Sequence, residues 1–116
     1  MGGLRLEHCV PCSRNTPPMN PDEIDAMLAE VRAWEKVEED GILRLKKQFT
    51  FKNFTQALAF TNKIGALAEN EGHHPAILTE WGKVTIYWWT HIIHGLHQND
   101  FIMAAKTDEL VDQREE

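Results

Sequence analysis

Clustered histidines are the part of this sequence best suited to chemistry. Five of the six histidines lie within residues 73–97, among them the adjacent pair His73 and His74 and, further on, His91. Histidine gives and takes protons near neutral pH, and it is also the commonest protein ligand of metal ions. The cluster therefore indicates either acid–base catalysis or metal binding.

The spacing of the histidines disfavours a metal site. His91, His94 and His97 are three residues apart, so on a helix they would turn through about 240° and could not share one face. Successive side chains of an extended segment point to opposite sides, which would separate His73 from His74. The HExxH motif of zinc enzymes is absent. We expect no native metal site.

Acid–base catalysis fits the same residues better than metal binding does. Pro75 fixes its own φ angle and favours an extended backbone at His74, so the two adjacent imidazoles project from a stiff corner. Pairing of two later strands could bring Thr90 and His91 to that corner. A single histidine could instead satisfy a buried carbonyl group, and this alternative weakens only when several histidines converge.

Composition limits what the rest of the chain can be. The 116 residues are 42% hydrophobic and 26% charged, which is typical of one globular domain. The net charge of −6 disfavours nucleic acid and anionic membranes as partners. Neither a membrane span nor the apolar run of a signal peptide is present, and the two cysteines, Cys9 and Cys12, do not make a disulfide scaffold. We expect a cytoplasmic protein with two thiols in a loose arm.

The first half of the chain predicts an arm, a helix, a hairpin and a second helix. Residues 1–19 read as a flexible N-terminal arm, and residues 20–116 as a single domain. A helix should start after Asn20 and end near Trp34, and residues 43–51 alternate like a strand whose partner lies within residues 35–41. Lys47 interrupts that alternation and suggests a bulge or a sheet edge.

The second half predicts another hairpin between two helices. A helix of about 18 residues should run from the N-cap Asn53 to Gly72. Residues 76–79 and 83–90 read as the second hairpin, and a last helix should begin at about Phe101 with Asn99 or Asp100 as its cap. The predicted fold is α+β: three helices packed on one face of a four-stranded antiparallel sheet, in the order helix, hairpin, helix, hairpin, helix.

Several motifs together resemble those of one family. They are Glu69-x-x-x-His73-His74-Pro75, Trp81-x-x-Val84 and Thr90-His91-x-x-x-Gly95-Leu96-x-x-x-Asp100. This pattern resembles the pterin-4a-carbinolamine dehydratases, over about residues 20–110. The resemblance implies the layout described above, and it implies a hydro-lyase, a 4a-hydroxytetrahydrobiopterin dehydratase, that needs no cofactor.

The resemblance also implies roles for particular residues. His73 and His91 correspond to a general acid–base pair, and His74 to a residue that positions the pterin and shares in proton transfer. Glu69 and Asp100 correspond to substrate-binding acids beside the histidines. For Asp100 the alternative is a helix N-cap, and for Glu69 a solvated residue near a helix end. Which histidine is the acid and which the base stays open.

The family's partners follow from the same resemblance. The substrate is 4a-hydroxytetrahydropterin, which an aromatic amino acid hydroxylase releases, and the product is quinonoid dihydropterin. A homodimer or homotetramer is implied, and a non-catalytic interaction protein of the same fold, a dimerisation cofactor or an assembly or maturation factor, is the alternative. His94 and His97 fall outside the pattern, and we expect the aromatic residues Trp81, Tyr87, Trp88 and Trp89 to serve the core or an interface.

Overall fold

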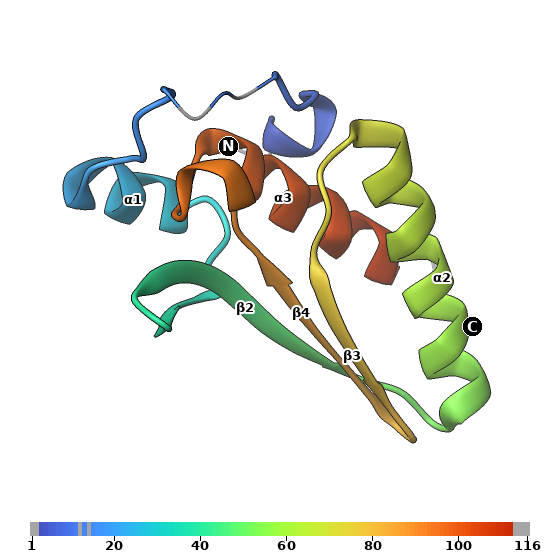
Figure 1. The fold of residues 1–116 in the computed structure, drawn as a ribbon. Coiled ribbons are helices and arrows are strands. Elements are labelled where there is room, and N and C mark those ends of the chain that lie inside the picture. Colours follow the sequence, from blue (N-terminus) through green and yellow to red (C-terminus); the bar gives the residue numbers. More distant parts are fainter. Residues whose placement is uncertain (1–2, 12, 14, 113–116) are drawn as a thin grey trace.

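The computed structural model describes residues 3–11, 13 and 15–112, and its elements follow the predicted α+β order (Figure 1). The helices are α1 (Pro21–Leu28), α2 (Phe54–Glu71) and α3 (Gln98–Asp112). The strands are β1 (Glu35–Glu39), β2 (Ile42–Thr50), β3 (Ala76–Glu80) and β4 (Lys83–Trp88). Short 3-10 turns lie at Leu4–Leu6 and His91–Ile93.

One antiparallel sheet joins the strands in the order β1-β2-β4-β3. In the central pair, Leu45 of β2 lies opposite Trp88 of β4, and Phe49 lies opposite Val84. These four side chains are buried on one face, and Ile86 joins them there. Val84, Ile86 and Trp88 therefore share the buried side of β4.

Helices α2 and α3 cover that buried face, and α1 lies beside α3 (Figure 1). The hydroxyl groups of Thr61 on α2 and Thr79 on β3 are hydrogen-bonded at 2.6 Å. On α3, Thr107 Oγ1 accepts a hydrogen bond of 3.1 Å from the buried indole of Trp88. Polar contacts of this kind fix the angle of each helix on the sheet without leaving buried groups unpaired.

Local capping explains where the first two helices begin. Asn20 accepts a hydrogen bond from the Glu23 N–H, and the Glu23 side chain accepts one from the Asn20 N–H, a capping box. Asn53 accepts from the Gln56 N–H at the start of α2, and Gly72 ends that helix with φ +67°. The predicted extent of the second helix is confirmed.

The first helix is shorter than predicted. It ends at Leu28, and tight turns carry the chain to Trp34, which together with Val31 is still buried. The indole Nε1 of Trp34 donates to the carboxylate of Asp108 on α3 at 3.1 Å. The apolar spacing that suggested a longer helix therefore reports burial of Val31 and Trp34, because turns can bury the same side chains.

The prediction of a bulge or edge at Lys47 is wrong. Lys47 holds regular register opposite Ile86 of β4, within a strand that lies inside the sheet. Its ammonium group lies 2.7 Å from Asp108 Oδ1 and 4.8 Å from the ring centre of Phe49. A lysine can occupy the apolar face here because α3 supplies a carboxylate for its charge.

The last helix begins earlier than predicted, at Gln98 rather than Phe101. Neither Asn99 nor Asp100 is its cap. The His97 Nδ1 accepts from the Asn99 N–H at 3.0 Å, and Asp100 accepts from the His97 N–H at 2.9 Å. His97 is thus the cap, and the first turn already contains Asn99 and Asp100.

The N-terminal segment differs from the predicted flexible arm, because its described residues contact the domain. Leu4 is buried with the core, and Lys106 Nζ donates to the Arg5 carbonyl at 2.9 Å. Cys9 donates its backbone N–H to Glu71 at 2.9 Å. Cys12 lies outside the described residues. Among residues 3–11, 13 and 15–112, the structure has no helix long and apolar enough to cross a membrane.

Replacing Leu45 by alanine should test the packing of the helices on the sheet. Leu45 is fully buried at the centre of the sheet, so Leu45→Ala should lower the free energy of unfolding by about 2–5 kcal/mol. Leu58→Ala, at a 43% exposed position on α2, is the matched control and should change it by less than about 1 kcal/mol. Urea unfolding followed by circular dichroism measures both, and equal effects would contradict this packing.

Candidate active site

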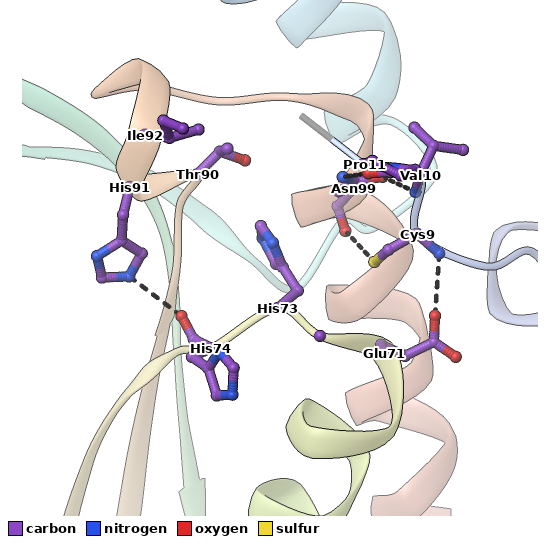
Figure 2. Close-up of a pocket in the computed structure, with 11 residues that line it drawn as sticks. Cys9, Val10, Pro11, Glu71, His73, His74, Thr90, His91, Ile92 and Asn99 are labelled. Carbon is purple, nitrogen blue, oxygen red and sulfur yellow. Dashed lines mark hydrogen bonds between the residues drawn. The ribbon is translucent and has the colours of Figure 1, made fainter. Parts of the chain in front are cut away.

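A pocket of about 630 Å³ lies where the end of α2, the end of β4 and the start of α3 meet (Figure 2). Its lining comes from four segments: residues 9–11, 71–74, 90–92 and Asn99. The volume falls in the range of small-molecule sites. The described residues that line it include three of the clustered histidines, His73, His74 and His91.

His73 is placed by the end of α2. The left-handed Gly72 turns the chain, and the His73 N–H donates to the Ala68 carbonyl at 3.1 Å. The His73 ring is largely buried and lies parallel to the Trp88 indole, with 5.9 Å between ring centres. Its Nε2 atom is 2.6 Å from Asp100 Oδ1. The end of α2, the Trp88 indole and the Asp100 carboxylate together hold the His73 ring in one orientation.

Asp100 is fully buried and receives two further hydrogen bonds. Thr90 Oγ1 donates to its Oδ2 at 2.8 Å, and the His97 N–H donates to the same oxygen at 2.9 Å. A carboxylate that accepts from these two donors also accepts from His73, so His73 Nε2 carries the hydrogen. The Nδ1 atom of His73 is therefore the nitrogen that remains for chemistry.

His91 is oriented by different neighbours. Its Nε2 lies 3.1 Å from the backbone carbonyl of His74, and because a carbonyl only accepts, Nε2 must donate. The His91 ring stacks on the Trp89 indole with 4.2 Å between ring centres, and the Arg44 guanidinium lies 4.1 Å from the centre of the Trp89 ring system. As in His73, Nδ1 is the ring nitrogen left for proton transfer.

His74 and Glu69 form an exposed pair at the rim. His74 Nε2 is 2.6 Å from Glu69 Oε2, and both side chains are more than half exposed. His74 lines the pocket, whereas Glu69 does not. Glu69 therefore holds the imidazole of His74 rather than facing the pocket itself.

The structure thus brings together His73, His74 and His91, as the sequence predicts. Asp100 lies behind His73, where its two oxygens already receive three hydrogen bonds, so it positions that imidazole rather than contacting a ligand. His94 and His97 do not line the pocket. The four aromatic residues considered above do not line it either, although Trp88 and Trp89 stack on His73 and His91.

Sequence reasoning missed Glu71, Asn99 as a lining residue, and residues 9–11. A signal existed for Glu71: an acid in the last turn of a helix is unfavourable unless nearby donors compensate it. In the structure its carboxylate accepts from the Cys9 N–H and contacts His8 Nδ1, both at 2.9 Å. Asn99 and the segment before Pro11 carried no comparable signal.

Among the described residues of the site, Glu71 is the group whose pKa departs clearly from its ordinary value. Its side chain is only 4% exposed, and burial alone would raise its pKa. The hydrogen bonds from the Cys9 N–H and His8, with the positive charge of Lys106, outweigh burial and leave the pKa below its ordinary value of 4.5. The carboxylate is therefore ionised at neutral pH.

Within the described part of the chain, no three or more His, Cys, Asp or Glu side chains are grouped so that they could hold a metal ion. Three imidazoles line the pocket, and in His73 and His91 the Nε2 atom is bound to an acceptor that the buried Asp100 or the backbone supplies. The fold and site define a small α+β protein with three histidines around a pocket that is large enough for a small molecule.

Comparison with known proteins identifies the family. Residues 17–110 match the family described as pterin 4 alpha carbinolamine dehydratase, and the chain belongs to that family of hydro-lyases. A relative from Chlorobium luteolum, named as a proposed pterin-4-alpha-carbinolamine dehydratase, is 54% identical over 110 residues, which cover 95% of this chain and 96% of the relative.

Two solved structures share the fold. A transcriptional coactivator/pterin dehydratase from Brucella melitensis is 28% identical, with a TM-score of 0.73 over 80% of this chain and 97% of its own. A pterin dehydratase-like protein identified as a RuBisCO assembly factor in the alpha-carboxysome is 26% identical, with a TM-score of 0.57 over 67% of this chain and 88% of its own. The predicted family and fold class are therefore confirmed.

The lowered pKa of Glu71 predicts a dependence of stability on pH. A carboxylate with a depressed folded-state pKa stabilises the fold above its unfolded value, here 4.5, and loses this contribution as the pH falls through the folded-state pKa. Glu71→Gln removes the titration and keeps the shape. The difference in unfolding free energy between wild type and variant should be largest near neutral pH. It should become smaller as the pH falls below 4.5.

Chemical unfolding of both proteins across that acidic range measures the difference. Glu30→Gln, at an exposed position, is the control and should give a small difference throughout. A difference for Glu71→Gln that stays constant as the pH falls would contradict the assignment.

Proposed function

We propose that the protein dehydrates 4a-hydroxytetrahydropterin to quinonoid dihydropterin. Membership of the family supports the reaction class. The observation that carries the proposal is the pair of imidazoles in one pocket, each with Nε2 held by a fixed acceptor, Asp100 for His73 and the His74 carbonyl for His91.

The chemistry of the substrate matches this pair. The C4a–O bond breaks, and the hydroxyl group leaves as water after it receives a proton from an imidazolium ion. The proton on N5 passes to a neutral imidazole, and the electron pair of the N–H bond forms the C4a=N5 double bond. One proton is donated and one is accepted, so the reaction needs no oxidant, and general acid–base catalysis is sufficient.

In this proposal His73 and His91 exchange these two protons. Asp100 keeps His73 in one tautomer and one orientation, as a carboxylate does for a catalytic imidazole elsewhere. His74, held by Glu69, lies at the rim, where it can hydrogen-bond the pterin and share in proton transfer. An aromatic amino acid hydroxylase, which oxidises a tetrahydropterin, would supply the substrate.

Substitution of the two histidines tests the mechanism. His73→Ala and His91→Ala should each lower kcat by about 10²- to 10⁴-fold, because each removes one general acid or base. His94→Asn is the matched control: His94 is an exposed histidine outside the pocket, and asparagine tolerates its φ of +54°. The control should keep near wild-type activity.

Disappearance of the carbinolamine, followed by ultraviolet absorbance during turnover by an aromatic hydroxylase, gives the rates. Circular dichroism confirms that each variant is folded. A loss of less than about tenfold in both alanine variants would rule out the acid–base assignment.

A non-catalytic role is the second candidate, because one of the similar structures reported above is a transcriptional coactivator/pterin dehydratase and another is a RuBisCO assembly factor. The same assay separates the two roles. A folded wild-type protein that does not accelerate dehydration would favour an interaction protein, whereas acceleration that depends on His73 and His91 would favour the enzyme.

We also propose a homodimer or homotetramer. Supporting it, Leu78 of the edge strand β3 and Trp81 in the following turn are 52% and 69% exposed, and such side chains are common at subunit interfaces. Light scattering coupled to size exclusion should give two or four times the 13.4 kDa chain mass. A mass of one chain at assay concentration would contradict this proposal.

A further inference from the structure

The N-terminal segment runs along α3 to reach the pocket. Leu4 is buried against the core, and the Arg5 carbonyl accepts from Lys106 Nζ near the end of the helix. Further on, Glu7 Oε1 accepts from Gln98 Nε2 at 3.2 Å, at the start of the same helix. The segment therefore lies antiparallel to α3 and delivers residues 9–11, the strap, to the pocket.

Two buried side chains hold the strap in place. Asn99, which is 3% exposed, accepts from the Val10 N–H at 3.0 Å and donates to the Val10 carbonyl at 2.8 Å. Glu71 accepts from the Cys9 N–H at 2.9 Å. Because two hydrogen bonds to one residue fix both position and orientation, this clamp gives the strap a defined place beside the site.

The clamp also determines what the strap offers a ligand. Three polar backbone groups of Cys9 and Val10 are bound by Glu71 and Asn99, so the strap contributes largely apolar surface from Cys9, Val10 and Pro11. Val10 is 55% exposed, so a ligand in the pocket can contact its side chain. Figure 2 shows the strap on the side of the pocket away from His91 and His74.

We propose that the strap is a binding wall for the pterin ring, and that Asn99 and Glu71 are positioning residues that hold this wall. This inference rests on the proposed function, because it takes the ligand to be a pterin. The bicyclic ring is flat and has apolar faces, so it lies against the strap while its reacting edge faces the histidines. The strap sets affinity, and the histidines carry out the proton transfers.

A wall of this kind has a kinetic signature. Contacts with a part of the substrate that does not react strengthen ground state and transition state equally, so their loss raises KM and leaves kcat unchanged. Loss of a general acid or base does the reverse, because it lowers kcat. The two parts of the site can therefore be separated by experiment.

The experiment compares Asn99→Ala with the matched control Asn70→Ala, an exposed asparagine near the end of α2. Calorimetry with 6-methyl-7,8-dihydropterin, a pterin without the 4a-hydroxyl group, measures binding, and the absorbance assay measures turnover. Asn99→Ala should weaken pterin binding and raise KM by about tenfold, with kcat within about twofold of wild type. Asn70→Ala should match wild type in both assays.

A second variant covers the case in which Asn99→Ala fails to fold. Val10→Asp keeps the clamp and places a charge on the wall at a half-exposed position, so it should fold and weaken binding by a similar factor. If the variants bind the pterin more weakly than wild type but wild type shows no turnover, the result would support the strap and contradict the proposed reaction. If the folded variants bind the pterin with wild-type affinity, the strap is not a binding wall. The proposal would also be wrong if wild type did not bind the pterin at all.

Discussion

The burial of one carboxylate is the constraint on which this site depends. A charged group without solvent is costly unless hydrogen bonds compensate it, and Asp100 is compensated by three donors. The donors come from different parts of the chain: His73 after α2, Thr90 after β4 and His97 at the start of α3. Satisfying Asp100 therefore fixes the relative positions of three segments, and those segments carry the pocket.

The first turn of α3 serves both sides of the pocket at once. Asp100 reaches inward to His73, and its neighbour Asn99 reaches outward to the backbone of Val10. Because both residues belong to one helical turn, movement of the helix start would displace the imidazole and the strap together. His97 caps this helix: its Nδ1 atom accepts a hydrogen bond from the Asn99 N–H, which holds that turn in place.

Local signals predicted what is locally determined. The second helix runs from Asn53 to Gly72 as expected, because its cap and its left-handed stop lie within the segment itself. The histidine site came from motif resemblance, which carries long-range information. Lys47 and the contact of Glu71 with Cys9 were not predictable in this way, because their partners lie 61 and 62 residues away in sequence. A charged residue whose hydrogen-bonding partner is far away in sequence looks unfavourable in its local segment until the fold is known.

The two catalytic candidates differ in the charge of the group that holds them. His73 faces a buried carboxylate, whereas His91 faces a neutral carbonyl. Both partners only accept hydrogen bonds, so both fix the same tautomer, with the hydrogen on Nε2 and Nδ1 left for a ligand. Under the proposed reaction, these matching tautomers let the two Nδ1 atoms exchange the proton of the leaving hydroxyl group and the proton of N5. One buried carboxylate would then fix the geometry of the pocket and, together with the His74 carbonyl, the ring nitrogen at which each proton is exchanged.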